Sequence, residues 1–150
     1  MLEQAVKQTA AAKLMAYYAL WLTHLGEAYL LAGRIEDACQ YARQALELAH
    51  DSKQMGYEAY ALRLLGEIAG HHVPPDIDQA TAHYRQALAL AEELGMRPLQ
   101  ARCHFALGEL AKQAGETRDA QEQFEKAASM FRDMGMQSWL EKAEAALKDL

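Results

Sequence analysis

Long hydrophobic runs are scarce in this sequence, although half of it is apolar. Hydrophobic residues make up 51% of the 150 residues. Lys, Glu, His or Gly nevertheless interrupt each apolar run well before the roughly 18 residues that a membrane-spanning helix needs. The N-terminus also lacks the basic-then-apolar order of a secretory signal peptide. These absences argue against an integral membrane protein and predict a cytoplasmic chain.

Cysteine and positive charge are also limited. The two cysteines, Cys39 and Cys103, lie singly within helical patterns, so we expect packing residues and no disulfide framework or CxxC pair. Fifteen Lys and Arg against 21 Asp and Glu give a net charge of −6. A net negative charge repels phosphate backbones, and no basic run is present to hold anionic lipid. Nucleic acids and membrane surfaces are therefore excluded as partners.

Catalytic motifs are missing as well. The sequence contains no GxxxxGK[ST], GxGxxG, HExxH or GxSxG, so we predict neither an enzyme nor a bound cofactor. The densest group of metal-ligand residue types is GHHVPPDID at 70–78. His71 and His72 point apart on a helix, and the aspartates lack the spacing of known metal loops. We expect an enlarged turn without a metal, in which Asp76 or Asp78 caps the next helix.

Internal repetition is the strongest feature of the sequence. Three Leu-Gly-Glu segments are separated by 40 and then 42 residues, and each is followed by a turn and two alanines seven residues apart. Small residues allow two helices to approach closely, and large residues one turn away fill the groove beside them. The pattern therefore predicts stacked helical hairpins. The repeated positions are Leu25-Gly26, Leu65-Gly66 and Leu107-Gly108, with the alanine pairs 38 and 45, 80 and 87, and 120 and 127.

These residues resemble the signature of the tetratricopeptide repeat, in which Leu-Gly and an aromatic lie on a first helix and two alanines flank a large residue on a second. In the first unit the matching residues are Leu22, Leu25, Gly26, Tyr29, Ala38 and Ala45. The period of 40 to 42 exceeds the usual 34. In this respect the segment 87–115 is similar to the C-terminal repeat arrays of bacterial signalling proteins that carry a nucleotide cyclase or an ATPase module.

Periodicity and helix breakers predict an all-α, right-handed solenoid of antiparallel helix hairpins in a single domain, 1–150. Counting 21 residues back from Gly26 gives Ala5, in a context like that of the later alanines, so the chain is expected to begin with half a repeat. We predict repeats at 14–52, 53–96 and 97–136 and a capping helix at 137–150. The expected helices are 2–11, 14–32, 35–50, 53–70, 77–94, 98–114, 117–133 and 138–149.

The resemblance also implies a binding groove. In this family the first helix of each unit lines the concave face, and the residue after Leu-Gly points into it, which here is Glu27, Glu67 or Glu109. Three acidic residues beside aromatic ones favour a basic or amphipathic segment of a protein or peptide. The alternative, that the glutamates are only solvated helix formers, stays open. The further groove candidates are Leu20, Thr23, Leu30, Tyr60, Arg63, Arg102, Phe105 and Lys112.

We therefore predict a non-catalytic protein–protein interaction scaffold belonging to a bacterial signalling protein. One alternative is a self-association or regulatory segment that acts on neighbouring domains, and another is a small-molecule sensor with a closed apolar pocket. His104 replaces a large apolar residue of the repeat, so it should be half-buried and hydrogen-bonded.

The two ends of the array differ in the cover that they need, because a solenoid unit buries its apolar face only against neighbours. At the C-terminus, Trp139, Leu140, Ala143, Leu147 and Leu150 form one apolar stripe that suits a cap. At the N-terminus, Leu2, Val6 and Met15 lack their usual cover. We therefore expect a homodimer joined through residues near 1–30, or failing that a monomer whose first ten residues fray.

Overall fold

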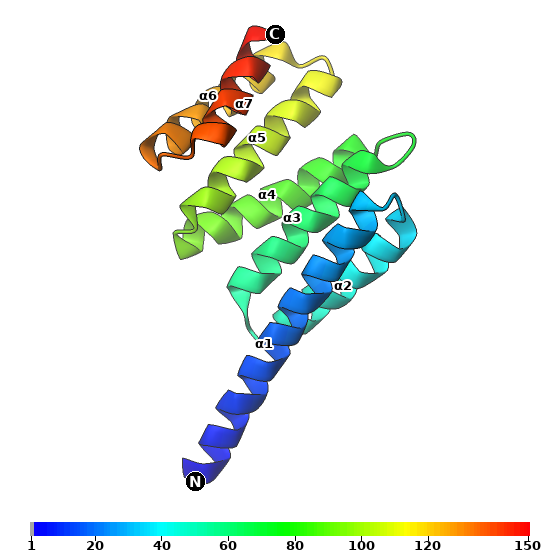
Figure 1. The fold of residues 1–150 in the computed structure, drawn as a ribbon, viewed down its shortest axis with the longest axis vertical. Coiled ribbons are helices and arrows are strands. Elements are labelled where there is room, and N and C mark those ends of the chain that lie inside the picture. The colour runs from blue at the N-terminus through cyan, green and yellow to red at the C-terminus, as the bar shows by residue number, and fades with distance from the viewer. Residues whose placement is uncertain (1) are drawn as a thin grey trace.

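The computed structural model describes residues 2–150, and in that part of the chain every regular element is a helix (Figure 1). The predicted all-α class is confirmed. The helices are α1 Leu2–Leu31, α2 Ile35–Asp51, α3 Met55–His71, α4 Ile77–Leu94, α5 Arg97–Gln113, α6 Thr117–Asp133 and α7 Gln137–Lys148.

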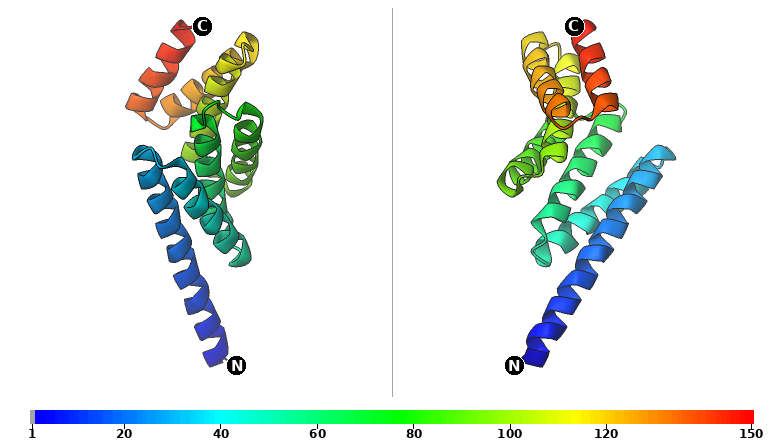
Figure 2. Two further views of the ribbon diagram at one scale, coloured as in Figure 1. Left: turned by 90° about the vertical axis from the view of Figure 1, so that its right-hand side faces the viewer. Right: turned by 60° about the vertical axis from the view of Figure 1, so that its left-hand side comes forward.

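Consecutive helices pack in pairs. The most extensive contacts join α1 with α2, α3 with α4, and α5 with α6, and α7 packs on α6. Smaller contacts join α1 with α3 and α3 with α5, so the first helices of successive hairpins are neighbours. Figures 1 and 2 show the hairpins following one another along the long axis of the molecule. This arrangement is the predicted solenoid.

The Leu-Gly glycines lie where helices approach most closely. A Cβ at Gly66 would lie 2.9 Å from Tyr84, and one at Gly108 would lie 2.7 Å from Phe124. Both aromatic residues belong to the second helix of the same hairpin. The expected alternation of small and large residues is therefore confirmed at these positions. The alanines of the repeat are fully buried, namely Ala38, Ala45, Ala80, Ala87, Ala120 and Ala127.

The turns also follow the sequence. Gly33 and Gly95 have φ of 76° and 70°, a left-handed conformation that suits glycine at the end of a helix. In the enlarged turn after α3, a carboxylate oxygen of Asp76 accepts a hydrogen bond of 3.1 Å from the backbone N–H of Gln79. Asp76 is thus the N-cap of α4, as expected.

The N-terminal helix differs from the prediction. We expected a break between residues 11 and 14, whereas α1 is one helix of 30 residues. The physical reason is composition, because Ala11 to Leu14 are strong helix formers with neither glycine nor proline among them. The prediction of half a repeat at the start was therefore wrong. The first part of α1 extends away from the hairpins (Figure 1).

The exposure of the N-terminal apolar residues agrees with the expectation. The exposed fractions are 85% for Leu2, 66% for Val6 and 41% for Met15, and Ala16 is the first buried residue that the structure describes. At the other end, Leu140 and Ala143 of α7 are buried against α6 in a cluster that includes Phe131. The two ends of the array are thus covered very differently.

Candidate functional site

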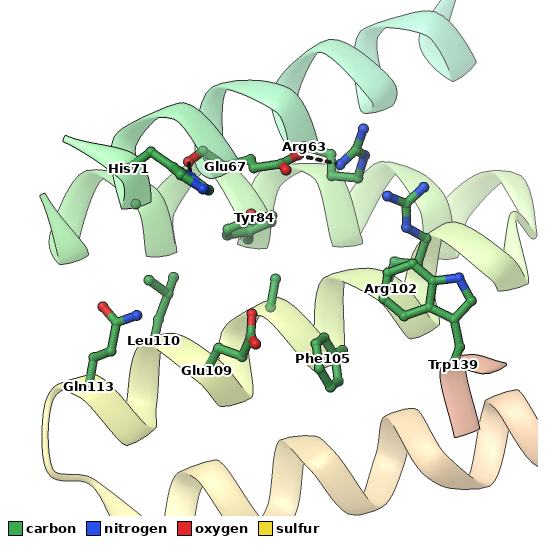
Figure 3. A pocket seen from close by; sticks show the side chains of 13 residues that line it. Arg63, Glu67, His71, Tyr84, Arg102, Phe105, Glu109, Leu110, Gln113 and Trp139 are labelled. Carbon is green, nitrogen blue, oxygen red and sulfur yellow. Dashed lines mark hydrogen bonds and ion pairs between the residues drawn. The ribbon is translucent and has the colours of Figure 1, made fainter. Parts of the chain in front are cut away.

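A cavity of about 190 Å³ opens between α3 and α5, beside Trp139 of α7. Figure 3 shows side chains of α3 and α5 that face one another across it, with the ring of Tyr84 from α4 nearby. A second cavity, of about 820 Å³, shares Phe105, Glu109 and Trp139 with the first and continues along α7. We call the two cavities together the α3–α5–α7 groove. The charged side chains lining it are Arg63, Glu67, Arg102, Glu109, Lys112, Lys142 and Asp149.

A buried cation links the first two hairpins beside this groove. The side chain of Arg63 is only 7% exposed. Its Nη2 donates to Oε1 of Glu27 at 2.7 Å, and its Nη1 donates to Oε2 of Glu67 at 2.9 Å. Charge-assisted hydrogen bonds of this kind are short and strong. Glu27 and Glu67 therefore neutralise Arg63, and their carboxylates are already ion-paired within the chain.

Aromatic rings and cations form one wall of the groove. The guanidinium of Arg102 lies 5.0 Å from the centre of the Trp139 ring, and the ammonium of Lys142 lies 4.6 Å from it. Phe105 meets the same ring edge-on, with 5.8 Å between centroids. Burial and the nearby Arg63 lower the pKa of Arg102, whose guanidinium still remains charged at neutral pH. The wall therefore offers both apolar contact and positive charge.

Unlike Glu67, Glu109 forms no ion pair within residues 2–150. Desolvation in the cavity raises the pKa of Glu109, and the carboxylate of Glu67 adds to this rise, whereas Lys112 opposes it. Lys112 lies in the second cavity, close to the same wall. Charges of both signs therefore lie along the groove.

The structure brings five of the predicted groove residues together. Lys112 lines the second cavity, and Glu27 reaches the site through its ion pair with Arg63. The sequence therefore located five of the 13 residues that line the first cavity. These five residues are Arg63, Glu67, Arg102, Phe105 and Glu109.

Four other candidates lie apart from the groove. Thr23 is only 3% exposed, and its hydroxyl donates to the backbone oxygen of Ala19 at 3.0 Å. This differs from the expectation that Thr23 faces the groove, because its side chain is buried and its hydroxyl is already hydrogen-bonded within α1. Leu30 is half-buried and packs on the cluster around α2 and α3. Leu20 is half-buried and Tyr60 is 37% exposed, and neither lines the groove.

Some residues that line the groove were not predicted from the sequence. Trp139 was assigned to the apolar stripe of the cap, and it does pack on Phe131 with 5.6 Å between ring centroids. The same ring also lines the groove. His71 and Gln113, near the ends of α3 and α5, were missed as well. Only the position of Trp139 at the edge of its stripe could have indicated the second role.

The predictions for His104 and Cys103 are confirmed. His104 is half-buried, and its Nδ1 lies 2.7 Å from Oε1 of Gln123. Cys103 is buried, and this burial raises the pKa of its thiol to about 11. Cys39 is half-buried and unpaired. Among residues 2–150, no three His, Cys, Asp or Glu side chains gather as a metal-binding group.

Stacked helix hairpins with a groove between their first helices define a helical repeat scaffold. Two models of the tetratricopeptide repeat match this sequence, over residues 22–51 and 76–133, which together make up more than half of the chain. The chain belongs to the tetratricopeptide repeat family. The fold of this family supports a scaffold for protein–protein interactions.

A solved structure shows the same fold. The tetratricopeptide repeat domain of FLU from Arabidopsis is similar over 81% of this chain and 98% of its own, with a TM-score of 0.69 and 18% sequence identity. No curated protein matches the sequence. Within residues 2–150, no helix is both long enough and apolar enough to span a membrane.

Proposed function

We propose that this chain is a non-catalytic scaffold that holds a segment of a partner protein in the α3–α5–α7 groove. The observation that carries the proposal is the aromatic wall formed by the half-buried Phe105 and Trp139, beside Arg102 and Glu109. Aromatic and arginine side chains in a hollow supply most of the binding energy in many protein interfaces. We further propose that 1–150 forms one repeat domain, with repeats at 14–52, 53–96 and 97–136 and a capping helix at 137–150.

An amphipathic segment suits the groove better than a purely basic one. Two of the three repeat glutamates share Arg63, so their charge is already compensated. Arg102, Lys112 and Lys142 add positive charge along the same surface. A bound helix with one apolar face and charges of both signs would match the aromatic wall and the flanking groups.

We also propose that the chain is a cytoplasmic module of a bacterial signalling protein. The support for this is the repeat period of 40 to 42 residues and the amino-acid sequence of the segment 87–115. A small-molecule sensor is a weaker alternative, because such a site requires a closed apolar pocket. The first cavity is instead lined by four charged side chains, Arg63, Glu67, Arg102 and Glu109.

Selection from a displayed library of random peptides tests the proposal. The parent chain should enrich amphipathic helical sequences, and the variant Arg102→Glu with Glu109→Lys should lose them because both charges in the groove are reversed. A matched control is Arg85→Glu with Glu92→Lys, which makes the same exchange at exposed positions of α4 outside the groove. Peptides that bind the groove variant and the control equally well would contradict the proposed site.

A further inference from the structure

The outer face of α1 carries large apolar residues that no other helix within residues 2–150 covers. The repeat places Trp21 and Leu25 at positions whose counterparts on α3 and α5 are at most 7% exposed, because the preceding hairpin covers them. On α1 the exposed fractions are 72% for Trp21 and 39% for Leu25. The covered counterparts are Ala61 and Leu65 on α3 and Cys103 and Leu107 on α5.

These exposed residues belong to a continuous seam. Leu14, Tyr18, Trp21 and Leu25 follow one another at intervals of four, three and four residues. This is the a and d spacing with which two helices pack side by side. Leu14 is 65% exposed and Tyr18 is 58% exposed. The seam therefore has the sequence pattern of a helix–helix contact and an open surface.

The first half of α1 needs a neighbour for another reason. At 30 residues and about 1.5 Å per residue, α1 is roughly 45 Å long, whereas α2 to α6 have 17 or 18 residues each. Each described side chain ahead of Ala16 is exposed, and Figure 2 shows this segment beyond the hairpins. Short isolated helices are marginally stable in water, so packing must supply the stability.

We propose that α1 pairs antiparallel with α1 of a second copy, with Leu14 close to the two-fold axis. The projecting residues of each copy then lie on the Tyr18 to Leu25 face of the other. This arrangement covers the open seam of each copy with the projecting segment of the other, whereas a parallel pair would place seam against seam and projecting segment against projecting segment. In this register Lys7 faces Trp21 of the second copy, in a position for a cation–π contact, and Ala10 faces Tyr18. The pairing does not depend on the α3–α5–α7 groove.

Two observations favour a second copy over another hairpin of the repeat type. In the later units, the preceding hairpin packs closely on Ala61 or Cys103, the residues equivalent to Trp21. The large indole of Trp21 leaves no room for a hairpin to approach α1 as closely. The exposed area is also sufficient for a dimer. Aromatic side chains bury about 150–250 Å² each, so Tyr17, Tyr18 and Trp21 with Leu14 and Leu25 offer roughly 600 Å². This is at the lower end of the roughly 600–1,000 Å² per partner of stable interfaces.

Light scattering after gel filtration tests the pairing on the full chain. The parent, with a chain mass of 16.7 kDa, should elute as a dimer of about twice that mass at about 100 µM. Leu14→Glu with Trp21→Glu should weaken the dimer at least about tenfold, because four charges enter the seam. The control Leu31→Glu, 90% exposed on the same helix but off the seam, should stay dimeric with the same helicity. A monomeric parent, or a seam variant as dimeric as the control, would overturn the proposal.

A spin label distinguishes the two orientations. Gln4→Cys places a label beside the seam, with Cys39→Ala removing the half-buried cysteine, while the buried Cys103 stays out of reach. In the antiparallel pair the two labels are about 20 residues apart along the axis, or roughly 30 Å. A parallel pair holds them within about 20 Å, because paired helices lie about 8–10 Å apart. A distance in the shorter range would contradict the antiparallel arrangement.

Discussion

At the scale of single residues, the packing of each hairpin depends on the glycine of its Leu-Gly pair. Gly108 lies against the ring of Phe124, which is fully buried. Gly70, in contrast, lies within α3 where an added methyl group would meet only a Leu110 carbon at 4.0 Å. These two helical glycines therefore separate the effect of close packing from that of backbone entropy.

We expect Gly108→Ala to lower the free energy of unfolding by about 1–2 kcal/mol. Overpacking a rigid contact costs about 1–3 kcal/mol, and this exceeds the gain of up to about 1 kcal/mol from better helix propensity. Gly70→Ala should raise the free energy of unfolding by up to about 1 kcal/mol, because it keeps the gain without the clash. Urea denaturation of both variants measures the difference. Equal stability of the two would show that the approach to Phe124 is not tight.

Glu109 should make stability depend on pH. Its pKa is raised in the folded chain, so the folded state binds a proton more tightly than the unfolded state does. In the range between the ordinary carboxyl pKa and the raised value, stability therefore falls as pH increases. Glu109→Gln should raise the melting temperature at pH 7 and lose this advantage below about pH 4, where the parent carboxyl is protonated in both states. An advantage that is equal at both pH values would exclude ionisation as its cause.

At the scale of helices, the sequence predicted α2 to α7 within two residues at each end. Local signals are strong there, since glycine follows α4 and Pro98 lies at the start of α5. The first helix was predicted wrongly because its repeat-like alanine was taken for a second hairpin helix, although no residue between 11 and 14 breaks a helix. Helix formers continue a helix whether or not a neighbour is there to pack on it.

The groove was predictable only in part. The repeat register located Phe105 and Glu109 because their positions follow directly from the Leu-Gly pair. It could not show that Arg63 is buried between Glu27 and Glu67, because this ion pair joins residues 36 positions apart. Trp139 also remained hidden, since its approach to α5 depends on how α7 packs on α6. Long-range packing sets these features.

The double variant Glu27→Gln with Glu67→Gln should destabilise the chain by about 2–3 kcal/mol. It leaves the buried Arg63 without a carboxylate, which costs about 3–5 kcal/mol for fully buried pairs and less here because both glutamates are about one third exposed. Glu92→Gln with Glu93→Gln, on the exposed side of α4, removes equal charge and should change stability little. Equal losses in the two double variants, measured by urea denaturation, would contradict a structural role for the Arg63 ion pairs.

At the scale of the whole molecule, each hairpin is stabilised mainly by its neighbours. Contacts follow the order of the chain, and α7 touches α6 without extensive contact to α2 or α3. In such an array stability is close to a sum of repeat and interface terms, so damage at one end stays near that end. The C-terminal end therefore offers a direct test of how cooperative the array is.

Removing residues 137–150 should destabilise α6 and α5 far more than α3. The deletion uncovers the fully buried Phe131 and removes Trp139 from its ring contacts, for a loss of about 3–5 kcal/mol. Hydrogen exchange should show faster exchange in α5 and α6, with the protection of α2 and α3 nearly unchanged. Removing only residues 149–150, which follow α7 and are exposed, should leave the exchange pattern as it is in the parent. A uniform loss of protection from α2 to α6 would show instead that the array unfolds as one cooperative unit.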